Sequence, residues 1–336
     1  MPRTQTVPEF SVIVATRNRA AMLESTLRSL VAQTGEYSRE LIVVDNGSTD
    51  STAAVLRDWR EKAGLKVLFE PISGKSRALN RALEVATGAL IAFTDDDVLV
   101  SEKWLEELLR ASYAFPSAAV VCGPIIPIFP PGTPDWLQTH PFANAAFAKF
   151  EFAIPEGPLS PGEVPYGPNF AVRTAAVRSM RFRLDLGPSS AAHLACEETE
   201  FLGRVRRQGN DFIYVPTAPV RHLVRDELTR IPALFDRAFF IGRSLVIANG
   251  RAVIYPVISS AESLEGENFS HAALLNLYIG EAYELESRSI PLQARLVEEI
   301  KFLPRFSGTC GFGKLASDFV RRSPWLVEKL SNSFMI

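Results

Sequence analysis

At residues 89–98 the chain reads ALIAFTDDDV. The mostly apolar first half is typical of a buried strand, and three aspartates, Asp95, Asp96 and Asp97, follow directly at its carboxyl end. Adjacent carboxylates repel one another and resist burial, so such a cluster is favoured where a cation neutralises it. In an open α/β sheet this edge is also where ligands bind. The stretch therefore predicts a divalent metal and a phosphate-bearing ligand, with a solvent-exposed acidic turn as the simpler alternative.

The composition is that of an ordinary globular protein. The chain has 336 residues, of which 47% are hydrophobic and 22% charged, and its formal net charge is −2. This length suits two domains, or one large domain with an appendage, and the charge gives no electrostatic reason to expect nucleic-acid binding. Three scattered cysteines favour a reducing compartment over a disulfide framework or a zinc site.

The sequence predicts a cytoplasmic protein without a transmembrane span. Prolines and charged residues interrupt the N-terminal region, which argues against a signal peptide, and no stretch reaches the ~18 uninterrupted apolar residues that a span needs. Aromatic and basic residues mix near the C-terminus. We expect them to pack on the core, and two alternatives remain open: peripheral contact with the inner face of the membrane, or contact with a second subunit.

Strand and helix patterns alternate over the first hundred residues. Apolar, β-branched runs predict strands at residues 10–16, 40–45, 65–69 and 89–93. Between them lie three segments with apolar residues at helical spacing. The order βαβαβαβ predicts a doubly wound sheet with right-handed crossovers.

Polar or acidic residues end three of these predicted strands. They are Thr16, Asp45 and the triplet Asp95–Asp97. Because the carboxyl ends of neighbouring parallel strands lie along one edge of a sheet, we expect the three groups to converge.

The chain changes character after residue 123. Eleven of its 23 prolines fall between Pro124 and Pro168, a pattern that favours ordered loops or a mobile lid over long helices. Regular patterns then return, and they predict an edge strand at residues 167–172, a helix at 197–208, and strands at 211–215 and 220–222. Beyond Asp226 the pattern is mainly helical.

Five motifs resemble those of the family 2 glycosyltransferases, in the order and at the spacing of that family. They are SVIVATRNRA, ELIVVDNGSTD, GKSRALNRALEVATGALIAFTDDD, GPNFAVR and CEETEF. The resemblance implies a GT-A fold, which is a Rossmann-like, doubly wound mixed sheet, and an inverting transfer from a nucleotide-sugar. It implies a GT-A domain at residues 1–225, with a nucleotide-sugar half at 9–123 and an acceptor half at 124–225. A mainly helical C-terminal extension would occupy residues 226–336.

The resemblance also implies which residues bind the nucleotide. Thr16 and Arg17 are expected to contact the base, and Asp45 resembles the acid that hydrogen-bonds a uracil ring. The donor is therefore expected to be a UDP-sugar, as for a hexosyltransferase. The alternative for Asp45 is an acidic turn residue before Asn46.

Further donor contacts are implied around the third helix and a later loop. Lys75 is placed to meet the base or a phosphate, or else is a flexible exposed lysine. Arg77 and Asn80 lie one helical turn apart and are expected to reach sugar or phosphate. Asn169 resembles a residue of the loop that lines the donor-sugar pocket.

The aspartate triplet resembles the DxD signature of the family. By this resemblance Asp97 binds Mn²⁺ or Mg²⁺ directly, while Asp95 holds the ribose or a metal-bound water. Asp96 is grouped with the donor-binding residues and is expected to support the loop. His222 resembles a histidine that some GT-A enzymes use as a further metal ligand, and a structural histidine is the alternative.

A second acidic cluster at Glu197 and Glu198 resembles the place where the family keeps its catalytic base. The usual pair ends in aspartate, so Glu198 departs from the pattern by one methylene. We expect Glu198 to be the base and Glu197 to bind the acceptor or support the site. The simpler alternative is that these acids only complement the helix dipole. Trp136 and Tyr166, with Phe142, are expected to stack on an acceptor that is a saccharide or is lipid-linked, unless they only anchor loops.

Three other functions remain open at this point. A phosphohydrolase would use Asp95 as nucleophile and Asp97 as acid, but no downstream lysine and acidic pair supports it. A nucleotidyltransferase lacks its glycine-rich turn after the first strand. A catalytically silent nucleotide-sugar binder is favoured only by the unusual Glu198.

Overall fold

The structure is a computed structural model, and it describes the α/β part of the chain almost completely. Described are residues 7–139, 145–189 and 193–230, and then positions 233, 234, 237, 240, 241, 244, 247 and 248. Phe142, the side chain of Trp136 and most of the predicted C-terminal helical region lie outside the described residues. Among the described helices, none is long and apolar enough to span a bilayer.

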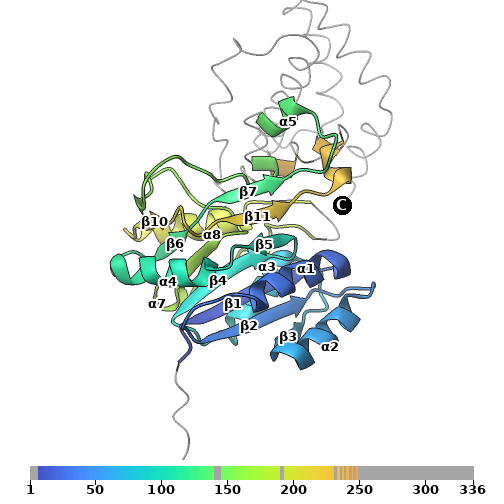
Figure 1. Cartoon of the computed structure of the whole chain (residues 1–336), viewed down its shortest axis with the longest axis horizontal. Coiled ribbons are helices and arrows are strands. Elements are labelled where there is room, and N and C mark those ends of the chain that lie inside the picture. Colours follow the sequence, from blue (N-terminus) through green and yellow to red (C-terminus); the bar gives the residue numbers. More distant parts are fainter. Residues whose placement is uncertain are drawn as a thin grey trace, which may run out of the picture.

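A mixed eight-stranded sheet forms the centre of the molecule (Figure 1). Its strands, in spatial order, are β3 (Lys66–Phe69), β2 (Arg39–Asp45), β1 (Phe10–Thr16), β4 (Leu90–Asp95), β9 (Phe170–Arg173), β6 (Val120–Cys122), β10 (Phe212–Tyr214) and β8 (Gly157–Pro158). The first four are parallel, while β9 runs antiparallel to both of its neighbours, β4 and β6. The predicted doubly wound mixed sheet is confirmed.

The position of β9 corrects one expectation. The stretch at residues 167–172 was expected to form an edge strand, yet β9 lies in the interior of the sheet between β4 and β6. Phe170, Ala171 and Val172 are fully buried, because helices and loops cover both faces of the sheet at this point. An edge strand would expose one row of backbone groups, whereas β9 pairs on both sides.

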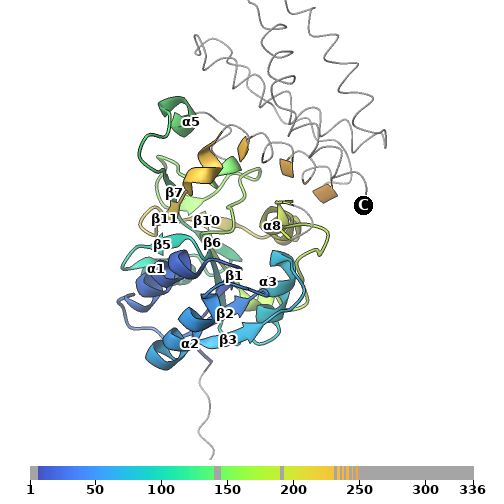
Figure 2. The same cartoon turned by 90° about the vertical axis from the view of Figure 1, so that its right-hand side faces the viewer.

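Helices cover the two faces of this sheet. The longer ones are α1 (Ala20–Val31), α2 (Thr52–Ala63), α3 (Lys75–Leu83), α4 (Trp104–Ala114) and α8 (Glu197–Arg207), and the short ones are α5 (Asp135–Thr139), α7 (Thr174–Val177) and the 3₁₀ turn η1 (Asp226–Thr229). Figure 2 shows α1 and α2 on one face of the sheet and α3 and α8 on the other. The helix predicted at 197–208 is therefore α8, and it ends before Gly209, whose positive φ of 83° suits glycine.

A row of aromatic rings fixes α8 against the central strand. Phe93 of β4 stacks on Phe170 with ring centroids 4.8 Å apart and meets Phe182 edge-on at 5.6 Å. Phe182 in turn stacks on Phe201 of α8 at 4.2 Å. All four rings are buried, and such contacts add to the stabilisation that comes from burying their area. The packing holds the first turn of α8 beside the carboxyl end of β4.

A small second sheet brings three distant segments together. It consists of β5 (Val98–Val100), β11 (Val220–Leu223) and β7 (Ile125–Ile128), with β11 in the middle. In the antiparallel pairing of β5 with β11, His222 stands opposite Val98, the residue after the aspartate triplet. The proline-rich segment contributes β7, an edge strand that contains Pro127, and proline is tolerated at an edge.

Candidate active site

The three polar strand ends meet at one edge of the main sheet, as predicted. Thr16 is level with Asp45 in the pairing of β1 with β2, and Ala15 is level with Asp95 in the pairing of β1 with β4. The carboxyl ends of these parallel strands therefore present their polar residues side by side.

The central acid of the triplet supports the loop. The Thr16 hydroxyl donates a 2.7 Å hydrogen bond to Asp96 Oδ2, and both residues are buried. Burial and the neighbouring Asp97 raise the pKa of Asp96 to about 7. The two side chains are directed at each other in this structure, and their predicted contacts with the donor stay predictions.

Asp97 lies between an arginine and a histidine. Arg19 Nη1 donates to Asp97 Oδ2 at 2.8 Å, and His222 Nε2 lies 3.5 Å from Oδ1. The other ring nitrogen of His222, Nδ1, lies 2.8 Å from the Phe147 carbonyl oxygen, which orients the ring. Burial alone would lower the pKa of His222, but its contact with Asp97 raises that pKa above the ordinary value.

Part of this arrangement fits a divalent cation. Asp97 Oδ1 is a buried atom with no hydrogen-bond partner among the described residues, and a carboxylate oxygen beside an imidazole nitrogen is a suitable donor set. No three His, Cys, Asp or Glu side chains of the described residues are grouped as a complete metal site. Asp95, predicted as a second ligand, contacts Lys75 in this structure. A cation here would depend on ligand oxygens to complete its coordination.

Lys75, the first residue of α3, joins the strand edge to α8. Its Nζ lies 2.6 Å from Asp95 Oδ1, 2.6 Å from Glu198 Oε1 and 3.6 Å from Glu197 Oε1. The side chain is only 20% exposed, so the alternative of a flexible surface lysine is wrong. Burial opposes the charge of Lys75, yet these carboxylates, with Asp95 first, raise its pKa well above the ordinary value.

The two glutamates of α8 occupy a tight, mostly buried space at the start of the helix. Burial and the adjacent Glu198 raise the pKa of Glu197 well above its ordinary value. Two glycines make room for the pair: a Cβ on Gly167 would lie 2.8 Å from Glu198 Cδ, and one on Gly187 would lie 3.1 Å from Glu197 Cδ. Glu198 Oε1 has no partner with hydrogen-bond geometry and lacks solvent contact, although Lys75 is close. The carboxylate is therefore held by the charge of Lys75.

The remaining predicted donor residues fall into two groups. Arg17 Nη1 donates to the Asn46 carbonyl oxygen at 3.1 Å, and Asp45 Oδ1 accepts the Ser48 amide at 2.8 Å. Both lie at the polar edge, and the Asp45 contact is that of an acidic turn residue. Asn80 is instead used structurally, since its amide group pairs with the backbone of Phe182.

Asn169 ties together the segments around β9, and its predicted place in the loop that lines the donor-sugar pocket stays a prediction. It is fully buried, its Oδ1 accepts from Trp104 Nε1 at 2.8 Å, and its Nδ2 donates to the carbonyl oxygens of Pro124 and Ala218. These bonds tie the segment before β9 to α4 and to the loops around it.

Tyr166 is the described member of the predicted acceptor aromatics. Its ring packs edge-on against Phe150 with centroids 6.2 Å apart and is partly buried against the core. This contact is that of a loop anchor. Trp136 belongs to α5, and its side chain lies outside the described part of the chain, as does Phe142.

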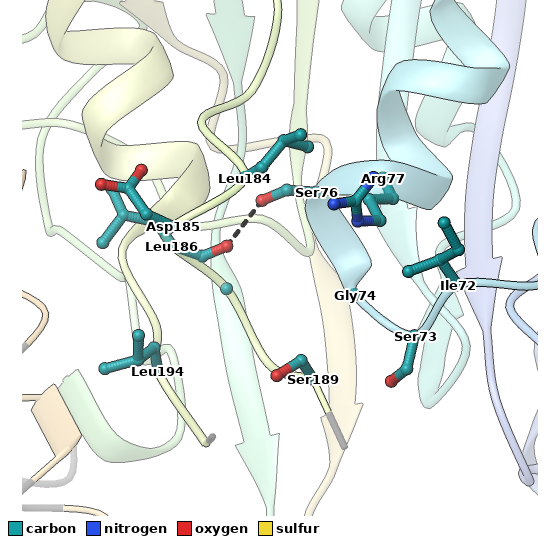
Figure 3. A pocket seen from close by; sticks show the side chains of 11 residues that line it. Ile72, Ser73, Gly74, Ser76, Arg77, Leu184, Asp185, Leu186, Ser189 and Leu194 are labelled. Atoms are coloured by element: carbon teal, nitrogen blue, oxygen red, sulfur yellow. Dashed lines mark hydrogen bonds between the residues drawn. The ribbon is translucent and has the colours of Figure 1, made fainter. Parts of the chain in front are cut away.

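A cavity of about 240 Å³ opens between the start of α3 and the loop before α8 (Figure 3). Arg77, a predicted donor residue, lines it together with Leu184 and Asp185, and Ser76 Oγ donates to the Leu186 carbonyl oxygen across its floor at 2.8 Å. Gly187 also lines the cavity and packs against Glu197. The cavity thus adjoins the carboxylate cluster.

Sequence reasoning missed two arginines of this site. Arg19, which donates to Asp97, is a residue of the SVIVATRNRA motif that the motif itself gives no role, although its place after a strand end could identify it. Arg237 comes from the C-terminal region, and its electrostatic neighbours are Asp97, Arg225, Glu197 and Arg19. No local pattern marks it.

The arrangement has counterparts in known proteins. Residues 11–184 match the model of glycosyl transferase family 2. The succinoglycan biosynthesis protein ExoM of Rhizobium meliloti is 31% identical over 234 residues, covering 67% of this chain and 71% of that protein. Validoxylamine A glucosyltransferase of Streptomyces hygroscopicus is 36% identical over 123 residues, covering 36% of this chain and 29% of its own length.

Solved structures share the fold. The mannosyltransferase PcManGT from Pyrobaculum calidifontis, in complex with GDP-Man and Mn²⁺, superposes with a TM-score of 0.54 at 21% identity over 95% of this chain and 81% of that one. S. aureus TarS 1–349 in complex with UDP gives a TM-score of 0.51 at 18% identity over 83% and 88%. The predicted GT-A fold and the predicted enzyme class are confirmed. On the family match and the relationship to ExoM, this chain is a glycosyltransferase and belongs to glycosyl transferase family 2.

Proposed function

We propose that this glycosyltransferase moves a sugar from a nucleoside-diphosphate sugar, with a UDP-sugar as first choice, to an acceptor hydroxyl by a single displacement that inverts the anomeric carbon. The main support is Lys75, whose Nζ is 2.6 Å from both Asp95 and Glu198. It connects an acidic strand edge suited to the donor with a buried carboxylate suited to the acceptor. In this proposal residues 9–123 serve mainly the nucleotide-sugar and residues 124–225 mainly the acceptor.

Glu198 is the proposed base. In the displacement the acceptor oxygen forms a bond to the anomeric carbon while the bond from that carbon to the diphosphate breaks, and the hydroxyl proton passes to Glu198. Glu198 is a buried residue in the first turn of α8, and its Oε1 lies 2.6 Å from Lys75 Nζ. Glu197, with its raised pKa, keeps a proton to higher pH than an ordinary glutamate, so Glu198 is the member of the pair assigned to accept one.

Asp97 and His222 are the proposed ligands of a divalent metal, Mn²⁺ or Mg²⁺. The buried Asp97 Oδ1, which lies 3.5 Å from His222 Nε2, supports this assignment, as does the Mn²⁺ named for the mannosyltransferase structure. A bound dication would neutralise the charge that develops on the diphosphate. Arg19, which donates to the other oxygen of Asp97, would hold that carboxylate in place.

The nucleotide and the acceptor are proposed from the polar edge and from the relatives. Asp45 and Arg17 lie where a base would meet the ends of β1 and β2, and TarS was solved with UDP while PcManGT was solved with GDP-Man. Names such as succinoglycan biosynthesis protein favour a saccharide or lipid-linked acceptor.

Membership of the family removes the phosphohydrolase and nucleotidyltransferase alternatives, and a catalytically silent binder is left for experiment. The full chain is incubated with UDP-glucose, UDP-N-acetylglucosamine and GDP-mannose in Mn²⁺, and release of UDP or GDP is followed. We expect slow donor hydrolysis that a chelator abolishes. A silent binder would bind a donor without releasing any diphosphate.

The base assignment has a matched control on the same helical turn. E198Q is expected to bind the donor with wild-type affinity and to lose transfer by ~100-fold or more, as for loss of a general base. E200Q changes a glutamate that pairs with Arg204 at 2.9 Å, so it should retain transfer. Normal transfer by E198Q would contradict the assignment.

A further inference from the structure

Lys75 and Arg77 leave the first turn of α3 in different directions. They are two residues apart in a helix, which separates their side chains by about 200° around its axis. Lys75 Nζ contacts Asp95 and Glu198 on one side. Arg77 lies on the other side, where it lines the cavity of about 240 Å³ together with Leu184 (Figure 3). No aspartate of the triplet is among the residues that line this cavity, so it is separate from the strand edge.

Arg77 is the unpaired polar side chain of the cavity. It is half-buried, and no residue that the structure describes forms a hydrogen bond or an ion pair with it. The other polar side chains of the wall are already used, since Ser76 donates to a backbone carbonyl oxygen and Asp185 binds Arg183 at 2.7 Å. The remaining two, Ser73 and Ser189, also interact with other residues. Because Arg183 neutralises Asp185 and an arginine stays charged at physiological pH, the cavity favours an anion.

Aliphatic side chains form much of the remaining wall. Ile72 comes from the loop before α3, and Leu184 and Leu194 come from the segment before α8 (Figure 3). Ile72 and Leu184 are each 56% exposed. Exposed apolar side chains that gather at one cavity, rather than lying singly over the surface, indicate a site that a ligand covers. The hydroxyls of a sugar would find few partners on this wall, whereas an alkyl chain would pack against it.

The cavity shares a wall with the proposed catalytic carboxylates. Gly187 lines the cavity, and a Cβ at this position would lie 3.1 Å from Glu197 Cδ. The Lys75 amide donates to the Pro188 carbonyl oxygen at 3.0 Å, which fixes this loop against the start of α3. A ligand in the cavity would therefore lie beside the acceptor side of the proposed site, where Glu197 and Glu198 are found.

We propose that this cavity binds the phosphate of a lipid-linked acceptor together with the first carbons of its chain, and that Arg77 binds the phosphate. The planar fork of a guanidinium suits two phosphate oxygens at once, and the aliphatic wall suits the chain. The inference rests on the proposed function and selects a lipid-linked acceptor over a free saccharide. It gives Arg77 a role toward the acceptor in place of the donor contact that the family resemblance implies.

The test measures binding of octyl phosphate, below its micellar concentration, to the full chain by calorimetry in a chelator. Octyl phosphate should bind about 10-fold or more tightly than inorganic phosphate, because each buried methylene strengthens binding about 4-fold. It should also bind more tightly than octyl glucoside, which lacks the charge. R77M is expected to weaken the binding of octyl phosphate about 10- to 100-fold, as for the loss of charge-assisted hydrogen bonds. R77K should fall between wild type and R77M, because lysine keeps the charge without the fork.

Matched controls separate the cavity from the surrounding surface. R81M removes an arginine one turn further along α3, which pairs with Glu84 at 2.7 Å, and it should bind octyl phosphate like wild type. I72S should weaken binding about 5-fold through lost apolar contact. I154S changes an exposed isoleucine that does not line the cavity, so it should have no effect.

Two further measurements connect the cavity to the acceptor. Saturating UDP should not displace octyl phosphate, because donor and acceptor bind together. Octyl glucosyl phosphate adds a sugar to the probe and should change the release of UDP from the donor in Mn²⁺. The release rises if the glucose is accepted and falls if the sugar only displaces water beside Glu198.

The opposite results overturn the inference in distinguishable ways. Displacement by UDP, or weaker UDP binding in R77M, returns Arg77 to the donor. Octyl phosphate binding that R77M leaves unchanged refutes the phosphate contact, and unchanged UDP release with octyl glucosyl phosphate refutes the acceptor role. Binding of phosphatidylglycerol vesicles through Arg77, without binding of octyl phosphate, assigns the cavity to a membrane lipid. If wild type binds octyl phosphate but releases no UDP or GDP from any donor, the proposed function fails and the phosphate site loses its acceptor role.

Discussion

Replacing Lys75 with methionine tests how the carboxylate cluster is held together. Lys75 is the cation between Asp95 and Glu198, and the side chains of all three are no more than 22% exposed. Removing one partner of a buried ion pair costs about 3–5 kcal/mol, and the residual solvent contact reduces the expected loss to about 2–4 kcal/mol. For a domain of this size that corresponds to a fall of about 4–16 °C in the melting temperature.

The loss of stability in K75M should increase as the pH rises. Without the lysine, the buried carboxylates hold protons to higher pH in the folded state than in the unfolded one, so the stability of the variant falls as pH rises above about 4. Urea unfolding should therefore show a larger deficit for K75M at pH 8 than at pH 5. K62M is the control, because Lys62 is 62% exposed and its pair with Asp58 should contribute under about 0.5 kcal/mol. An equal deficit at both pH values, or none, would refute this account.

Three further predictions concern packing and titration. G167A should lower both the rate of sugar transfer and the melting temperature, because the added Cβ would lie 2.8 Å from Glu198 Cδ. G162A is the control, since a Cβ there would enter open space and should change neither quantity. Activity and melting temperature are measured on the same samples. N169A should destabilise by about 3–5 kcal/mol in urea unfolding, since it leaves three buried partners unsatisfied, while donor affinity in the surviving folded protein should stay normal. Glu40 is partly buried, but hydrogen bonds from Lys66, Ser11 and Thr87 lower its pKa to about 2. Its stabilisation is therefore present above about pH 4.3 and lost as pH falls toward 2, and E40Q should flatten the dependence of urea unfolding on pH over that range.

Local sequence patterns were sufficient for the first half of the chain. The strands that end at Thr16, Asp45 and Asp95 could be predicted because each is an apolar run followed by a polar turn, and the parallel topology then determines that their ends converge. The four-residue strand β9 was misplaced because its length gives no information on which strands flank it. Its burial on both faces comes from long-range pairing with β4 and β6.

The roles of individual polar residues were harder to predict. Asn169 and Lys75 are both polar residues beside a glycine or proline, yet one is buried in a structural network and the other joins two acidic clusters. The two residues differ in the groups that the fold places around each of them. These groups come from distant parts of the sequence, as Trp104 shows, which is 65 residues away from its hydrogen-bond partner Asn169. The same reason explains why Arg237 carried no recognisable pattern.

The pairing of β11 with β5 constrains how this enzyme can vary in length. Side chains alternate between the two faces of a strand, so shifting β11 by a single residue would place Arg221 or Leu223 beside Asp97 and turn the imidazole of His222 away. Insertions or deletions between Tyr214 and Val220 should therefore inactivate the enzyme even when it folds. Changes of length in the exposed loop around Gly162 should be tolerated, which makes that loop the better place to graft new acceptor specificity.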